Sequence, residues 1–298
     1  MTLNKNEVQA LISLLDDTDT EIFNHVQEKL LHLGKEVIPS LEEAWSQAFD
    51  PVKQERIESL IHKIQFDSLI DELKDWAKNN SDDIIAGSIL IARHQYPDLD
   101  EERVFTELNQ LKRNIWLELN PNLTAFETIN VINRVLFDTH MFKGNTTNFH
   151  APANSYIHAV LESKKGNPLL LSIVYMKLSQ MLDLPVYGVN LPEHFILAYM
   201  DENNTLREVF TDGSSSNILF YINPFSRGTI FNKLEIDNFL KKLNVEPDEI
   251  YYQPCTNIEI IKRMIRNLTF SYQKLGDVEK VEELEKMMEA LTVDENLQ

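Results

Sequence analysis

Two polar residues in the second half of the sequence are placed so that their side chains could form one catalytic pair. His194 begins an apolar run, HFILAYM, and Asn223 ends another, ILFYIN. If these runs are neighbouring antiparallel strands, the start of one lies beside the end of the other and the two side chains meet. An imidazole held by an amide can act as a general base or acid near neutral pH. A strand-edge histidine bonded to a backbone carbonyl is the alternative interpretation of His194.

Other nucleophiles and metal ligands are sparse. Ser172 lies in a long apolar helix, where its hydroxyl either attacks a substrate or bonds back to the carbonyl four residues earlier. Cys255 precedes an expected helix, where its thiol pKa could be lowered, or it is a simple cap-region or partly buried cysteine. His140, His150 and His158 would have to converge from two helices and a loop to bind a metal. The sequence therefore predicts no metal site and no cofactor.

The elements that would position these residues change in character along the chain. The first 95 residues show only helical periodicity. After an apolar helix over 169–182, short runs rich in β-branched and aromatic residues predict strands, separated by Asn-rich and Gly-Ser-rich turns. These strands are expected at 186–189, 194–200, 206–210 and 218–222. Helices followed by a small antiparallel sheet in one segment favour an α+β fold rather than a parallel α/β fold.

The changes in pattern also predict three parts. A helical segment covers 1–97, a mixed core covers 98–250, and a pair of helices covers 251–298. Amphipathic helices are expected at about 51–64, 66–78 and 82–95 in the first part, and at 257–275 and 278–291 in the last. The helix over 169–182 is apolar nearly all round, as a buried central helix should be.

Charge and cysteine content exclude several classes of protein. The chain has 28 Lys and Arg against 47 Asp and Glu, giving a formal charge of −19. Nucleic acids and anionic membranes both require a cationic face, so neither is an expected partner. A single cysteine forms no intrachain disulfide and no cysteine-based zinc site. With no apolar run long enough for a bilayer and no signal-type stretch, we expect a cytoplasmic protein.

Long phrases of the middle segment resemble a known family. The stretch from Phe142 to Met200, followed by FYINPFSRG, is similar to bacterial SirB-type proteins. These proteins combine a transglutaminase-like core with a tetratricopeptide-like C-terminus. The last helices, NLTFSYQKLGDVEKVEELEKMMEAL, resemble one tetratricopeptide repeat, and the phrase VQALISLLDDTDTEIFNHVQEKLLHLGKEVIPSLEEAW resembles a HEAT-type unit.

The resemblance implies a site as well as a fold. The wider transglutaminase-like superfamily carries a Cys-His-Asp triad on a papain-like α+β fold, with the cysteine at the N-terminus of the central helix. Carried over by motif, the histidine position is His194 and the aspartate position is Asn223. The cysteine position is Pro168, which offers no nucleophile, and Glu193 stands where these proteins usually have glycine.

These departures lead to two functional hypotheses. The first is a non-catalytic protein-interaction module, which keeps the transglutaminase-like fold and binds a protein or peptide partner. The second is a hydrolase or acyltransferase acting on amide or peptide bonds, with His194 as general base and Ser172 or activated water as the nucleophile. A purely structural helical scaffold is a third interpretation, which the phrases around His194 and Asn223 do not favour.

Overall fold

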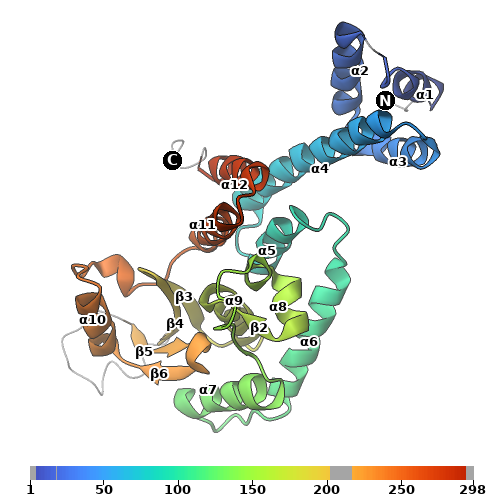
Figure 1. Ribbon diagram of the computed structural model, residues 1–298. Helices are drawn as coiled ribbons and strands as arrows, with labels where there is room; N and C mark the ends of the chain where they lie inside the picture. Colours follow the sequence, from blue (N-terminus) through green and yellow to red (C-terminus); the bar gives the residue numbers. More distant parts are fainter. Residues whose placement is uncertain (1–4, 18, 202–216, 293–298) are drawn as a thin grey trace. The chain divides into compact units, whose positions relative to one another are not determined.

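The computed structural model describes residues 5–17, 19–201 and 217–292. The chain divides into two compact units, one over residues 1–75 and the other over 76–298 (Figure 1). The boundary predicted near residue 97 thus lies inside the second unit, as does the one near residue 250. The candidate catalytic residues all belong to the second unit.

The first unit contains only helices among its described residues. They are α1 (Lys5–Ser13), α2 (Thr20–Leu33), a 3-10 turn (Gly34–Val37), α3 (Ile38–Gln47) and most of α4 (Pro51–Asn79). The two helices expected at 51–64 and 66–78 form this single helix, because no glycine or proline interrupts the chain between them. Buried side chains such as Leu30, Leu41 and Leu60 form the core of the unit.

Helices also make up most of the second unit. They are α5 (Ile84–Arg93), α6 (Glu101–Trp116), α7 (Ala125–Asn133), α8 (Ile157–Ser163), α9 (Pro168–Gln180), α10 (Lys233–Lys242), α11 (Asn257–Leu275) and α12 (Val278–Ala290). A π-helical turn (Arg134–Thr139) extends α7, and 3-10 turns cover Pro152–Ser155, Pro224–Ser226 and Glu249–Tyr251. Helix α10 was not predicted, although Asn232 and Glu235 form a capping box at its start.

Four strands form an antiparallel sheet in the order β3-β4-β5-β6. They are β3 (Val186–Leu191), β4 (His194–Met200), β5 (Ile218–Asn223) and β6 (Thr229–Phe231), and a short parallel pair joins β1 (Lys143–Gly144) to β2 (Lys165–Gly166). The strands expected near 186, 194 and 218 are present, β6 was not predicted, and the run 206–210 lies outside the described residues. This mixture of helices and small sheets agrees with the predicted α+β class.

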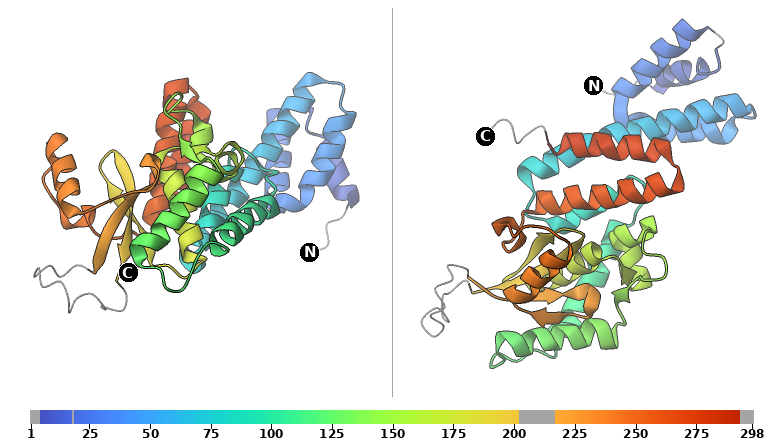
Figure 2. Two further views of the ribbon diagram at one scale, coloured as in Figure 1. Left: turned by 90° about the horizontal axis from the view of Figure 1, so that it is seen from below. Right: turned by 60° about the vertical axis from the view of Figure 1, so that its left-hand side comes forward.

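Helix α9 is the centre of the second unit. Every residue from Leu169 to Met176 is buried, because β3 and β4 cover one side of the helix and α5, α6 and α8 cover others. The opposite face of the sheet is covered by α10, through Ile236 and Leu240 (Figure 2). The apolar periodicity of 169–182 therefore predicted correctly that this helix is buried.

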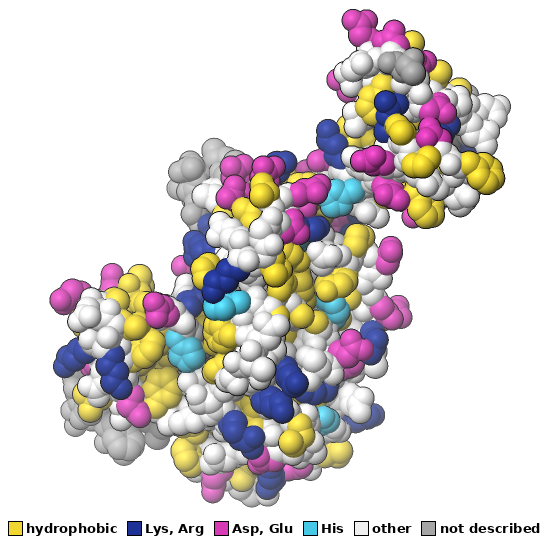
Figure 3. Space-filling model, viewed as in Figure 1, with side chains coloured by type: hydrophobic (Ala, Val, Ile, Leu, Met, Phe, Trp, Pro, Cys, Tyr) yellow, Lys and Arg dark blue, Asp and Glu magenta, His cyan; other side chains and the backbone are white. Residues whose placement is uncertain are grey.

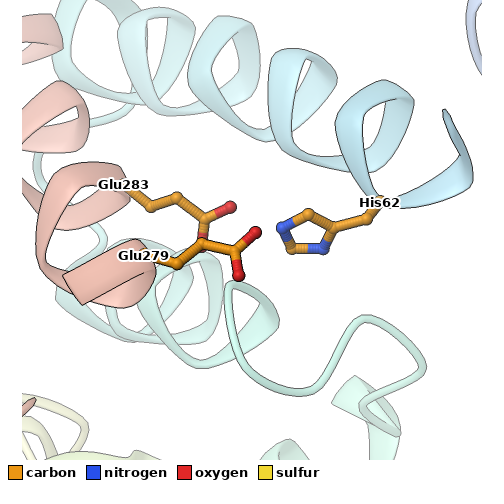
Figure 4. Close-up of side chains that lie close together, drawn as sticks. All are labelled: His62, Glu279 and Glu283. Atoms are coloured by element: carbon orange, nitrogen blue, oxygen red, sulfur yellow. The ribbon is translucent and has the colours of Figure 1, made fainter. Parts of the chain in front are cut away.

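The surface of α12 is acidic, but one of its carboxylates turns inward. Figure 3 shows acidic side chains gathered over α12. Glu279 and Glu283 leave the helix one turn apart (Figure 4), and Glu283 is buried with its Oε2 2.8 Å from Nε2 of His94. His62, also labelled in Figure 4, lies on α4 in the first unit. Within the described residues, no helix has both the length and the apolar content needed to cross a membrane.

The turn between β5 and β6 is tied to the helices through Gly228. Asn133 donates from Nδ2 to the carbonyl of Gly228 at 2.8 Å, and its Oδ1 accepts from the Tyr175 hydroxyl at 2.9 Å. Gly228 has a φ of 72°, in the region that favours glycine. A Cβ on Gly228 would lie 1.8 Å from Oδ1 of Asn133. This close approach holds the end of β5, which carries Asn223, against α7 and α9.

We predict that Gly228→Ala strongly destabilises the protein. The substitution adds the cost of a left-handed alanine to the loss of the Asn133 bonds, a total of about 3–5 kcal/mol. Gly276→Ala is the matched control, because Gly276 has a φ of 77° but no atom lies within 4 Å of its added Cβ. It should cost only about 1–2 kcal/mol. Equal losses in urea denaturation would show that the Asn133 contact adds nothing.

Candidate functional site

Strand pairing brings His194 and Asn223 together. β4 and β5 are antiparallel neighbours, which is the arrangement that the sequence argument required. Asn223 places its Nδ2 3.0 Å from Nε2 of His194. The structure therefore contains the predicted contact between the imidazole and the amide. Whether His194 donates or accepts in this contact depends on which amide atom faces the ring.

The orientation of the Asn223 amide fixes the tautomer of His194. Oδ1 of Asn223 accepts from the backbone N–H of Ser226 at 3.2 Å and so caps the 3-10 turn Pro224–Ser226. The amide NH₂ then faces the imidazole, and an NH₂ group only donates. Nε2 of His194 is consequently the acceptor, and the proton of the neutral ring resides on Nδ1.

The surroundings of His194 favour this neutral ring. Burial lowers the pKa of His194 below its usual value of 6.5, and the positive charge of Arg263 lowers it further. Hence the imidazole is uncharged at neutral pH.

Arg263 of α11 was not identified from the sequence. Its Nη1 donates to Oδ1 of Asn190 and to the carbonyl of Leu191, at the end of β3. The guanidinium also lies 5.9 Å from the ring centroid of Phe195. In the sequence, Arg263 is one of several basic residues of an amphipathic helix, and nothing in the pattern distinguishes it from exposed Arg266.

A pocket of about 540 Å³ opens beside His194. Strand β4 and the preceding turn contribute His194, Phe195 and Glu193, while α11 contributes residues from Arg263 to Ser271. The start of α9 and the loop before α8 complete the wall. A volume of this size suits a small molecule or one or two residues of a peptide.

Pro168 lines this pocket at the first position of α9. Proline is well accommodated there, because the first helical N–H has no partner within the helix. The preceding residue, Asn167, caps the helix by accepting from the N–H of Leu170 at 2.8 Å. Pro168 and His194 thus line the same pocket, but Pro168 carries a saturated ring and offers no nucleophile.

The two other nucleophile candidates are not part of this pocket. Ser172 is fully buried, and its hydroxyl donates to the carbonyl of Pro168 at 2.8 Å, the back-bonding alternative. Cys255 lines a different cavity, and burial raises the pKa of its thiol to about 12. The suggestion that a helix N-terminus lowers this pKa is wrong, because loss of solvation outweighs the helix dipole.

Two serine hydroxyls that were not predicted as site groups line the pocket, and each is already hydrogen-bonded within the protein. Ser155 accepts from Nδ2 of Asn167 at 2.8 Å, and Ser271 donates to the carbonyl of Asn267 at 2.9 Å. Each serine is at most 5% exposed.

A network of asparagines shapes the loop that leads to Ser155. Asn145 donates from Nδ2 to Oδ1 of Asn154 at 2.9 Å, and Asn154 donates to the carbonyls of Asn148 and Phe149. These bonds fix the backbone of Phe149, which precedes His150 at the edge of the pocket.

Aromatic rings form one edge of the pocket. His150 packs edge-on against Phe149 and against Phe270 of α11, with centroid distances of 5.2 Å in both cases. Phe149 and Phe270 are 42% and 47% exposed, so they offer apolar surface to a ligand. We name Phe149, His150 and Phe270 the aromatic rim.

The three histidines weighed as metal ligands are not brought together as a ligand group among the described residues. His140 contacts Asn114, with 3.0 Å between Nε2 and Nδ2. His158 packs against Tyr96 with a centroid distance of 4.6 Å, and His150 belongs to the aromatic rim. Each imidazole therefore has its own local environment.

Glu193 occupies a strained position beside His194. It is the second residue of the two-residue turn between β3 and β4, and its φ is 56°. Proline cannot adopt a positive φ, so the left-handed residue of this turn is the second one, in a conformation that glycine adopts most easily. Glutamate at this position costs about 1 kcal/mol and places a carboxylate at the pocket.

Three relatives are similar to this chain over part of its length. A UPF0162 protein of Xylella fastidiosa (strain 9a5c) is 28% identical over 193 residues, 63% of this chain and 64% of that protein. The UPF0162 protein PA3419 of Pseudomonas aeruginosa is 23% identical over 199 residues, 65% of this chain and 66% of that protein. F-box only protein 21 of Mus musculus is 26% identical over 144 residues, 48% of this chain and 21% of that protein.

The similarity therefore spans less than two thirds of the Xylella protein's length and about a fifth of the F-box protein's length. No solved structure matches the chain. The family model described as the transglutaminase-like superfamily matches residues 102–266, a range that contains Pro168, His194, Asn223 and Arg263. Because this range is more than half of the sequence, the chain belongs to the transglutaminase-like superfamily.

Proposed function

We propose that this protein is a non-catalytic member of its superfamily, which binds a protein or peptide partner through the pocket beside His194. The observation that carries the proposal is Pro168 at the first position of α9. A thiol at this position would combine the helix dipole with a neighbouring imidazole to form a nucleophile. Proline removes the nucleophile and leaves the fold intact.

The tautomer of His194 supports the same proposal. Because Nε2 accepts from Asn223, the remaining ring nitrogen, Nδ1, carries the proton of the neutral imidazole. A general base needs an unprotonated nitrogen directed at the group that it activates. In this arrangement His194 is a hydrogen-bond donor, which suits recognition better than proton abstraction.

In this proposal the helical flanks extend the binding surface. The SirB-type resemblance assigns a HEAT-like segment to 1–97 and a tetratricopeptide-like hairpin to α11 and α12. The hairpin turns at Gly276 and Asp277, and its first helix forms one wall of the pocket. We further propose a cytoplasmic location, where the single thiol of Cys255 stays reduced, and no nucleic-acid or anionic-membrane partner.

The competing function is a hydrolase or acyltransferase acting on amide bonds, with His194 as general base. It requires an activated water or a serine, since the thiol of Cys255 lies outside the pocket and stays protonated at neutral pH. Activity assays on the purified chain separate the two functions directly.

We predict no activity and a poorly reactive thiol in the native protein. Amine incorporation into a glutamine peptide and ammonia release from it should both equal the buffer blank. Iodoacetamide should alkylate Cys255 at pH 7 at least about tenfold more slowly than free cysteine, because its thiolate is scarce. Turnover that is lost in His194→Ala would overturn the non-catalytic assignment.

A second experiment tests the place of Pro168. In the Cys255→Ser background, Pro168→Cys puts the only thiol at the start of α9. We expect this thiol to react with iodoacetamide at least about tenfold faster than native Cys255, because the helix N-terminus lowers its pKa and the pocket leaves it accessible to the reagent. Ser172→Cys in the same background is the matched control, expected to stay unreactive since Ser172 is fully buried. Equal rates for the two variants would contradict the assigned position.

Asn223→Asp should raise the pKa of His194 by about 1–3 units. The new carboxylate still caps Ser226 but also accepts from the imidazole, so it favours the charged ring. In the native protein, the lowered pKa of His194 means that stability falls as pH drops below 6.5, where the unfolded chain takes up the proton first. NMR titration of the ring measures the shift, and Asn223→Asp should also reduce this acid-induced loss. An unchanged pKa would show that Asn223 does not contact the imidazole in solution.

A further inference from the structure

We propose that the pocket beside His194 recognises a carboxylate carried next to an apolar group, with Arg263 as its main anchor. This inference deepens the proposed function, since it names the chemistry of the ligand that the same pocket would bind. It rests on the hydrogen-bonding capacity of Arg263, on the tautomer of His194 and on the aromatic rim.

Arg263 has an edge that no described residue uses. Its hydrogen bonds to Asn190 and Leu191 both leave from Nη1. Neither Nε nor Nη2 donates to a described residue, and no described carboxylate lies within ion-pair distance of the guanidinium. Nε and Nη2 together form the fork that binds a carboxylate in a bidentate manner.

The partial burial of Arg263 strengthens the hydrogen bonds that Nε and Nη2 would donate to a ligand carboxylate. Loss of solvation lowers the pKa of the guanidinium, yet arginine remains charged at neutral pH. A charge that is partly removed from water and lacks a counter-ion is costly. A ligand carboxylate would offset this cost, and it would bind more strongly than at an exposed arginine.

His194 supplies a second donor to the same pocket. Its Nε2 is occupied by Asn223, so any polar contact between the ring and a ligand is made through the protonated Nδ1. Arg263 and His194 both line the cavity. Two donors in one pocket select an acceptor, and a carboxylate has two oxygens to offer.

The aromatic rim defines the second half of the ligand. Phe149, His150 and Phe270 present exposed ring surface at a pocket whose polar anchor is Arg263. Burying an aromatic side chain there removes apolar surface from water on both partners. The chemistry therefore fits a carboxylate beside a phenylalanine-like group, either at a peptide C-terminus or on an acidic side chain next to an aromatic residue.

Glu193 lowers the affinity of the pocket for a ligand carboxylate. It is the carboxylate among the pocket-lining residues, and it repels a second carboxylate placed near Arg263. It is exposed and forms no ion pair with Arg263, so its charge is screened by water and salt. We expect Glu193→Gln to strengthen carboxylate binding about two- to fivefold.

The test compares matched small probes on the full-length protein by isothermal titration calorimetry. N-acetylphenylalanine carries the carboxylate and the ring, and N-acetylphenylalaninamide carries only the ring. We expect the acid to bind at least about tenfold more tightly than the amide, because a bidentate arginine–carboxylate pair adds charge-assisted hydrogen bonds. N-acetylaspartylphenylalaninamide distinguishes an acidic side chain from a free C-terminus as the source of the carboxylate.

Variants then assign the preference to residues. Arg263→Gln should abolish the difference between acid and amide, whereas Arg266→Gln should preserve it, since Arg266 lies outside this pocket. Phe270→Ala should weaken both probes to a similar extent. If Arg263→Gln does not fold, the acid–amide comparison on the native protein and on Glu193→Gln still decides the matter.

The outcomes separate this inference from the non-catalytic assignment. Equal affinity for acid and amide, or no binding of either at millimolar concentration, overturns carboxylate recognition and leaves the activity assays unaffected. A preference that survives in Arg263→Gln overturns the assignment to this arginine. Catalytic turnover would overturn the non-catalytic function and leave the acid–amide preference to be judged on its own.

Discussion

The burial of α9 is the constraint on which the rest of the second unit depends. A helix with apolar side chains on all sides is stable only when other elements surround it, and here two strands and three helices do so. The sheet must therefore lie along α9. This packing brings the start of the helix to the pocket that also contains the first residue of β4, so Pro168 and His194 line the same cavity. The location of the site follows from the hydrophobic core, whatever chemistry the side chains support.

The side-chain amide of Asn223 determines how the ring of His194 is hydrogen-bonded. Asn223 bonds to the backbone at Ser226 through its oxygen, and only its NH₂ group remains for His194. An aspartate at the same position could cap the turn and accept from the imidazole at once, because a carboxylate has several lone pairs. With the NH₂ group of Asn223 directed at Nε2, the neutral imidazole of His194 offers its Nδ1–H as a donor. Pro168, at the first position of α9, has a saturated ring that offers no nucleophile.

Sequence reasoning was correct where a single hydrophobic periodicity or a single pair of strands determined the structure. The apolar pattern of 169–182 required a buried helix, and the contact between His194, which begins one run, and Asn223, which ends the other, required only antiparallel pairing. It failed for Arg263, because the role of this residue arises from contacts with Asn190 and Leu191, more than 70 residues away in the chain. For Cys255 the alternative of a partly buried cysteine is confirmed, and this burial dominates the thiol pKa. The aromatic rim combines a loop with α11, and no local pattern shows that they meet.

An anion-binding pocket in a chain with a formal charge of −19 is physically consistent. At physiological ionic strength the Debye length is about 8 Å, so most of the acidic surface does not act on a ligand inside the pocket. The groups that do act are those lining it, where Arg263 faces a low-dielectric surrounding and Glu193 faces water. Coulombic energy varies inversely with the dielectric constant, so the partly buried cation outweighs the exposed anion at comparable distance. The acidic surface then slows the approach of anionic ligands rather than preventing their binding, and added salt should speed association while leaving the contact with Arg263 largely intact.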